Sequence, residues 1–154
     1  MRAPTEPQVV MTSKFGLRTI NGKEEFHPGV DLRAPIDAPI YAPEQMKILR
    51  HGKGEKFGER FIVAEGSLVY KFMHVGLVNG IKDGDVLAEG TVIAKSDCSG
   101  TDAAHLHFET WPKGSNGWTG KAEDPEEFFF KCLLGQEFFP YMEGDKQRWY
   151  LKAV

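Results

Sequence analysis

The stretch FGERFIVAEGSLVYKFMHV, residues 57–75, decides the fold class. Apolar and polar residues partly alternate on both sides of a Glu-Gly-Ser turn at residues 65–67. Phe61 before the turn and Val69 after it would then share one buried face. The stretch therefore predicts a β-hairpin whose second strand ends at a histidine, His74.

Similar short segments, bounded by glycine, proline or charged turns, occur along most of the chain. Their spacing is typical of hairpins and not of alternating strands and helices. The further strands we expect are residues 8–12, 15–20, 41–43, 45–51, 85–88, 91–95 and, as the final strand, 103–111. Residues 21–31 are expected to form a turn-rich connection. The predicted fold class is all-β, with mainly antiparallel sheets that form a groove.

The chain has 154 residues, of which 41% are hydrophobic, which suffices for one core and not for two ordinary domains. We therefore predict a single domain, 1–154, with its core at about 9–125. Asp124-Pro125-Glu126-Glu127 is typical of a helix start, so residues 126–134 are expected to form one short C-terminal helix. The aromatic, irregular remainder of segment 126–154 either packs back on the sheet or docks a partner. Packing back would avoid exposing its aromatic side chains.

Charge and apolar runs exclude several classes of protein. The net charge is −3 and basic residues are interspersed with acidic ones, so no nucleic-acid partner is expected. No run of apolar residues is long enough to span a membrane, and the first ten residues lack the apolar core of a secretory signal. Cys98 and Cys132 are expected to be free, partly buried thiols, with a single disulfide as the alternative outside the cytosol.

The five histidines, His27, His51, His74, His105 and His107, are the main candidates for chemistry. His105 and His107 flank Leu106, and on a strand residues i and i+2 point to the same face. Their rings would project together, so that one can bind a metal while the other stands beside the open coordination position.

The segment FHPGVDL, residues 26–32, sets His27 four residues before Asp31. Pro28 favours an extended backbone at His27 and Gly29 permits an unusual turn, so both side chains could bend towards one point. Two imidazoles and one carboxylate suit catalytic zinc, which keeps a fourth position for water or substrate. His27, Asp31 and His107 meet that requirement, although each motif alone is weak.

The order of the motifs is more specific than any one of them. TSKFGLR, FHPGVDL, YAP, a strand-ending histidine, DGDVLAEGTVIA and SGTDAAHLHFE resemble, in sequence from about Met11 to Pro125, the LytM/lysostaphin-type endopeptidases. The resemblance implies a zinc metalloendopeptidase of bacterial peptidoglycan with one Zn²⁺ per chain. It implies zinc ligands at His27, Asp31 and His107.

The same resemblance implies catalytic roles for His74 and His105, without deciding which is base and which is acid. His74 departs from the family pattern, because Phe72-Met73 precedes it and Val75-Gly76 follows, where a small residue and Leu-Ser are common. His51 is expected to be a solvated turn residue and Arg18 a solvated charge. Glu109 could orient a ligand imidazole from outside the metal's ligand set.

The implied substrate is a peptidoglycan peptide, with a D-Ala to diaminopimelate cross-link as the first alternative and a glycine bridge as the second. A rival function is a non-catalytic LytM-like domain that binds the wall or activates other wall hydrolases. Such domains lose zinc ligands, whereas all positions are filled here. Without an export signal, a wall enzyme needs delivery, for which we expect a bacteriophage tail component or endolysin, with the C-terminal tail docking a virion protein.

Overall fold

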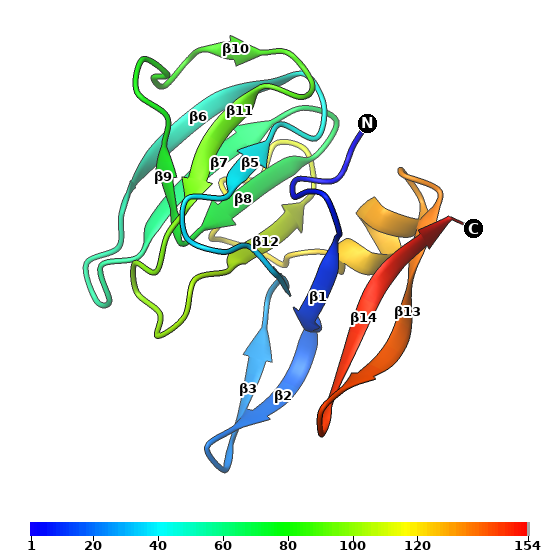
Figure 1. Ribbon diagram of the computed structural model, residues 1–154. Helices are drawn as coiled ribbons and strands as arrows, with labels where there is room; N and C mark the ends of the chain where they lie inside the picture. The colour runs from blue at the N-terminus through cyan, green and yellow to red at the C-terminus, as the bar shows by residue number, and fades with distance from the viewer. Residues whose placement is uncertain (154) are drawn as a thin grey trace.

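The computed structural model in Figure 1 describes residues 1–153 and shows a β protein with one short helix. Strand pairing is antiparallel throughout the described residues. One sheet has nine strands, a second has three, and a separate hairpin has two. The predicted fold class, mainly antiparallel sheets with one short helix, is confirmed.

The elements are as follows. The nine-stranded sheet has the order β10 (Val86–Leu87), β6 (Met46–Lys53), β7 (Arg60–Glu65), β8 (Val69–Met73), β12 (Leu106–Trp111), β4 (Val30–Leu32), β1 (Val10–Ser13), β14 (Lys146–Ala153) and β13 (Gln136–Glu143). The three-stranded sheet has the order β5 (Pro39–Tyr41), β11 (Val92–Ser96) and β9 (Val75–Leu77). The two-stranded hairpin consists of β2 (Gly16–Ile20) and β3 (Lys23–His27).

The hairpin predicted at residues 57–75 is β7–β8, which pairs Glu65 with Val69 across the turn. β8 pairs in turn with β12 at the middle of the large sheet. Every residue of β12 is buried, and so is β8 apart from its last residue. The two strands therefore lie between two packed layers.

On one side of these strands is the aromatic core. Tyr70 of β8 and Phe108 of β12 stack with ring centroids 5.9 Å apart, and both contact Phe129 of the helix η1 (Glu126–Lys131). The helix begins after Pro125 and has two acidic residues in its first turn, as the sequence predicts. Because side chains alternate along a strand, the opposite face of β12 carries His107, the metal ligand expected from the sequence.

Two local predictions are wrong. Residues 21–31 form β3 and most of β4 and are not merely a connection. Four of the five β3 residues are exposed, so no apolar alternation marks the strand in the sequence. Residues 103–111 do not contain the final strand, because the aromatic remainder folds into the hairpin β13–β14.

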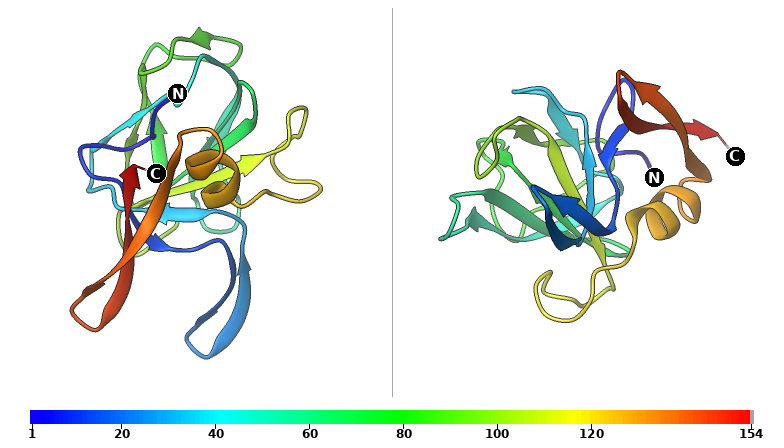
Figure 2. Two further views of the ribbon diagram at one scale, coloured as in Figure 1. Left: turned by 90° about the vertical axis from the view of Figure 1, so that its right-hand side faces the viewer. Right: turned by 90° about the horizontal axis from the view of Figure 1, so that it is seen from below.

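The C-terminal hairpin packs back onto the sheet through β14, which pairs with β1. Its strand β13 contains Pro140, and proline cannot donate a ladder hydrogen bond. β13 is the edge of the sheet, where one side of the strand needs no such bond. In Figure 1 and in the left view of Figure 2, the hairpins β2–β3 and β13–β14 extend from the same side of the body. The described helix is too short to cross a membrane.

Candidate metal centre

Gly29 brings the two halves of the site together. A Cβ at this position would lie 2.5 Å from the backbone oxygen of Phe108 and 2.9 Å from Cγ of Glu109, so only glycine permits this approach. The next residues form β4, which pairs with β12 so that Asp31 stands opposite His107. His27 ends β3 just before this point. The spacing of FHPGVDL thus places both of its polar side chains beside β12.

His27, Asp31 and His107 form a group whose candidate ligand atoms all lie within 4.8 Å of one another. Nε2 of His27 is 3.1 Å from Nδ1 of His107 and 3.2 Å from Oδ1 of Asp31. Nδ1 of His107 is 3.1 Å from the same oxygen. Zinc bonds of 2.0–2.1 Å at tetrahedral angles would separate ligand atoms by about 3.3 Å, so the three atoms fit such an ion.

The tautomers of the two ligand histidines also suit a metal. Nδ1 of His27 donates to the carbonyl oxygen of Lys14 at 2.7 Å, which leaves the lone pair of Nε2 free. Nε2 of His107 donates to Oε1 of Glu109 at 3.0 Å, which leaves Nδ1 free. Both imidazoles are therefore oriented by fixed acceptors, and each turns its free nitrogen towards Asp31.

The charges at the site reinforce one another. Burial acts to raise the pKa of Asp31, but hydrogen bonds from His105, His107 and His27 outweigh it and hold this pKa well below its usual range. Burial acts to lower the pKa of His107, but Asp31 and Glu109 outweigh it and raise the pKa to about 9. In the metal-free protein, an anionic Asp31 thus pairs with a protonated His107, and a cation bound at Nδ1 of His107 would displace that proton.

His74 and His105 stand beside this group. Their ring centroids are 4.6 Å apart, and the ring of His74 is 6.2 Å from that of His107. Each donates from Nδ1 to a backbone carbonyl oxygen, His74 to Ser99 at 2.6 Å and His105 to Ala103 at 2.9 Å. Both are half-buried, unlike the buried ligand histidines. Nε2 of His105 lies 3.4 Å from Oδ1 of Asp31, and Nε2 of His74 is the ring nitrogen that its hydrogen bond to Ser99 leaves for a substrate.

His74 has an unusual backbone, with φ at +64° in the left-handed region. Two backbone hydrogen bonds fix it: its N–H donates to Arg60, and its carbonyl accepts from Asp97. Strain of this kind persists where the surrounding structure enforces it, and it is common at functional sites. Burial lowers the pKa of the His74 imidazole below its ordinary value. Burial also opposes protonation of His105, but its hydrogen bond to Asp31 outweighs this and raises its pKa.

Other candidates lie elsewhere or have unexpected contacts. His51 is exposed on β6, not in a turn, and its Nδ1 is 2.6 Å from Oδ1 of Asp83. Cys98 and Cys132 are free and exposed. Arg18, expected to be only a solvated charge, donates to Oδ2 of Asp31 at 3.4 Å and to Ser13 at 2.8 Å. No local pattern signals this contact, because it depends on the β2–β3 hairpin folding back.

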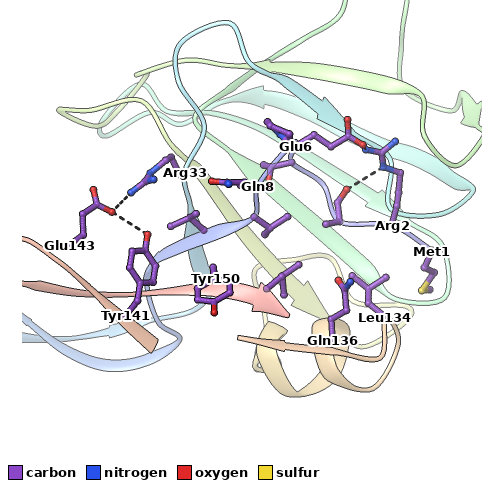
Figure 3. Close-up of a pocket in the computed structure, with 16 residues that line it drawn as sticks. Met1, Arg2, Glu6, Gln8, Arg33, Leu134, Gln136, Tyr141, Glu143 and Tyr150 are labelled. Atoms are coloured by element: carbon purple, nitrogen blue, oxygen red, sulfur yellow. Dashed lines mark hydrogen bonds and ion pairs between the residues drawn. The ribbon is translucent and has the colours of Figure 1, made fainter. Parts of the chain in front are cut away.

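A cavity of about 1100 Å³ lies between the N-terminal segment and the β13–β14 hairpin (Figure 3). Arg33 and Tyr141 both bind Glu143 at one end, and Arg2 pairs with Glu6 at the other. None of the histidines lines it. The charged groups of this cavity are paired with one another, and the cavity is separate from the metal centre.

Comparison with known proteins agrees with this arrangement. The family described as Peptidase family M23 matches residues 25–120. The chain is 30% identical over 93 residues to the peptidoglycan DD-endopeptidase ShyB of Vibrio cholerae. These 93 residues are 58% of this chain and 21% of that protein. The chain thus spans about a fifth of this relative's length.

Two solved structures share the fold. LytU is 31% identical, with a TM-score of 0.65 over 77% of this chain and 82% of that one. The catalytic domain of the antimicrobial peptidase lysostaphin from Staphylococcus simulans is 26% identical, with a TM-score of 0.60 over 77% of this chain and 90% of that one.

Proposed function

Because this chain belongs to peptidase family M23, we propose that it is a zinc metalloendopeptidase that hydrolyses peptide bonds in bacterial peptidoglycan. The observation that carries the proposal is the arrangement of three buried or half-buried donor atoms, 3.1–3.2 Å apart, beside two half-buried histidines. ShyB is described as a peptidoglycan DD-endopeptidase, which supports peptidoglycan as the substrate.

In this proposal His27 would hold the ion through Nε2, His107 through Nδ1 and Asp31 through Oδ1. A bound zinc ion supplies Lewis-acid chemistry, which polarises a peptide carbonyl and activates water near neutral pH. Arg18, at 3.4 Å, and the ligand imidazoles fix the Asp31 carboxylate from different sides. The protein therefore needs little rearrangement to bind the ion.

His74 and His105 would perform the proton transfers. Each ring is anchored through Nδ1, so proton transfer falls to Nε2, which in His105 also lies 3.4 Å from Oδ1 of Asp31. With centroids 4.6 Å apart, the two rings can serve opposite ends of one scissile peptide. One takes a proton from the attacking water and the other gives one to the leaving amine.

A chelation-and-rescue experiment on purified sacculi tests the proposal. The protein is stripped with a chelator, reloaded with Zn²⁺, and the released muropeptides are identified by mass spectrometry as new amino and carboxyl termini. Cleavage that disappears on stripping and returns with zinc is expected. The masses distinguish a D-Ala to diaminopimelate cross-link, which we propose first, from a glycine bridge.

Two outcomes would contradict the proposal. A protein that neither contains nor binds zinc would exclude the metal centre. Zinc binding without cleavage of any muropeptide would favour the rival function, a non-catalytic LytM-like domain that binds the wall or activates other hydrolases.

Action on the wall after delivery by a phage stays a prediction. Mass spectrometry of purified virions tests the tail version, which requires this chain to be present in the particle. The endolysin version instead requires the chain to appear in infected cells and not in virions.

A further inference from the structure

A buried lysine pairs with Glu109, the carboxylate that is hydrogen-bonded to His107. Lys71 lies on β8, opposite Glu109 of β12, and only 6% of its surface is exposed. Glu109 is 2% exposed. Lysine and glutamate side chains are rarely this buried unless they are paired with an opposite charge, because removing a charge from water is costly. The contacts of Lys71 and Glu109 should therefore explain why both charges are buried.

Glu109 is held through both of its carboxylate oxygens. Oε1 accepts the hydrogen bond from Nε2 of His107 at 3.0 Å. Oε2 accepts from the indole N–H of Trp111 at 2.7 Å and lies 3.7 Å from Nζ of Lys71. The orientation of the His107 ring thus depends on a carboxylate whose position and charge are set by Trp111 and Lys71.

Lys71 is itself covered by the loop that follows β12. Its Nζ donates to the carbonyl oxygen of Gly117 at 3.2 Å and lies 4.0 Å from the ring centroid of Trp118. The guanidinium of Arg50 also lies 4.0 Å from that centroid. Phe61 contacts the same ring edge-on at 4.9 Å. The loop therefore keeps water from the ammonium group and fixes its direction.

We infer that Lys71 is a positioning residue for the metal ligand His107, acting through Glu109 and shielded by the Trp118 loop. The inference rests on the proposed zinc site. Lys71 supplies the positive charge that compensates Glu109, and Glu109 in turn orients His107 so that Nδ1 faces the metal position. A carboxylate hydrogen-bonded to a ligand imidazole also makes that imidazole a stronger donor.

A double-mutant cycle on zinc affinity tests this chain of contacts. The variants are Lys71→Met, which removes the charge and keeps the length, Glu109→Gln, which removes the charge and keeps the shape, and both together. Competition with a chromophoric chelator gives the zinc dissociation constant. Glu109→Gln is expected to weaken binding about 10–100-fold and Lys71→Met about 10-fold, as for other partners of metal ligands.

The double variant decides the mechanism. If Lys71 acts through Glu109, the double variant binds zinc no more weakly than Glu109→Gln alone, since the charge that the lysine compensates is already gone. Additive losses would show that Lys71 acts independently and would overturn the inference. So would an unchanged dissociation constant in Lys71→Met. Lys131→Met is the matched control, because this exposed lysine pairs only with Glu127 of its own helix, and no change is expected.

A spectroscopic readout separates positioning from general destabilisation. The visible absorption of the Co²⁺-substituted protein reports ligand geometry, and Lys71→Met and Glu109→Gln should shift it in the same direction. Trp118→Leu offers a second route, because Trp118 is 42% exposed and its loss leaves the core intact. Trp118→Leu should weaken zinc binding, as Lys71→Met and Glu109→Gln should. Unchanged affinity in both Trp118→Leu and Glu109→Gln would overturn the inference even if Lys71→Met did not fold.

The inference can fail separately from the proposed function. A wild-type protein that binds no zinc would contradict both the inference and the proposed function. A wild-type protein that binds zinc and cleaves peptidoglycan, with Lys71→Met binding equally well, would remove the inference alone.

Discussion

Each histidine of the metal centre uses one ring nitrogen for a fixed hydrogen bond and keeps the other for chemistry. The acceptor is a backbone carbonyl for His27, His74 and His105, and the Glu109 carboxylate for His107. A ring with one nitrogen anchored cannot flip without losing a hydrogen bond, so its tautomer is set before any ligand arrives. The difference between the histidines is exposure: the ligand pair is buried and the other pair is half-buried.

The division between ligands and proton carriers predicts unequal losses on substitution. His27→Ala and Asp31→Ala should lose both zinc and activity, because each removes one of three donors. His105→Ala should keep zinc and lose about 10²–10⁴-fold in turnover, the range for a proton-transferring residue. Metal content by mass spectrometry, alongside turnover, checks this. Loss of zinc from His105→Ala would show that the two histidines of the His-Leu-His pair have been assigned the wrong way round.

The raised pKa of His107 predicts that metal binding releases protons. At pH 7 a group with a pKa of about 9 holds its proton in the metal-free protein, and Nδ1 must lose it to bind a metal. The apparent zinc affinity should therefore rise with pH from 7 towards 9 and flatten above. Calorimetry in buffers of different ionisation enthalpy measures the released protons directly. A zinc affinity independent of pH over this range would contradict the prediction.

The residues of the site were predictable where their signal is local. His27 and Asp31 lie in one short motif and His105 and His107 in another, so spacing and strand alternation made them candidates. Their separate roles were implied by the family resemblance of the ordered motifs. Arg18 and Lys71 were not predictable, because their contacts join different strands. Arg18 reaches Asp31 only through the β2–β3 hairpin, and Lys71 meets Glu109 only through the register of β8 with β12.

At the scale of elements, the short strand β4 depends on one glycine. The backbone of Gly29 passes so close to β12 that a Cβ would meet the oxygen of Phe108 at 2.5 Å. β4 has only three residues, so it has few other contacts with which to hold its register. Asp31, in the middle of β4, depends on this close approach.

Gly29→Ala should therefore destabilise the protein by about 1–3 kcal/mol and weaken zinc binding as well. Urea unfolding and zinc titration measure the two effects. Gly54→Ala, just after β6, is the control, because its Cβ would meet the carboxylate end of the flexible Glu59 side chain, and zinc affinity should not change. Equal effects of the two substitutions on zinc affinity would argue against a special role for the β4–β12 approach.

The helix η1 contributes to stability through two fully buried aromatic residues, Phe129 and Phe130. Phe129 is fully buried and packs against Tyr70, Phe108 and Phe130. Phe129→Ala should cost about 3–5 kcal/mol in unfolding free energy because it leaves a cavity in the core. Phe128→Ala on the exposed side of the same helix should cost far less, as Phe128 is 45% exposed. Thermal unfolding of the two variants compares them, and similar losses would contradict this packing.

The hairpin at 57–75 and the helix were predictable because apolar alternation, turn residues and a proline-acidic start are short-range signals. The β3 strand and the C-terminal hairpin were not. β3 is mostly exposed and shows no alternation, and β13 carries Pro140, which only an edge strand tolerates. Whether a strand lies at an edge is decided by the assembled sheet and not by its own sequence.

For the whole molecule, the metal centre joins parts of the chain that are distant in sequence. His27 and His107 are 80 residues apart, and their elements belong to the hairpin β2–β3 and the large sheet. A ligand that binds only the folded state stabilises it by about 2.7 kcal/mol at 100 times its dissociation constant. For a chain of this size that corresponds to roughly 5–10 °C in Tm.

Saturating zinc should therefore raise the Tm of the stripped protein by about this amount, and a chelator should reverse the change. Circular dichroism or calorimetry at matched protein concentration measures it. His27→Ala should show no zinc-dependent shift, and an equal shift in that variant would place the stabilising ion elsewhere.

The pairing of β1 with β14 has a mechanical consequence. The two strands are antiparallel, with Val10 opposite Tyr150 and Met11 opposite Trp149, so the start of one lies beside the end of the other. Figure 1 shows both chain ends on this side of the molecule. Tension applied between the chain ends would break the hydrogen bonds between β1 and β14 one after another, starting at the ends, instead of loading all of them at once in shear. Under force the C-terminal hairpin should peel away first, while β4 and β12, which carry Asp31 and His107 further along the sheet, yield later and at higher load.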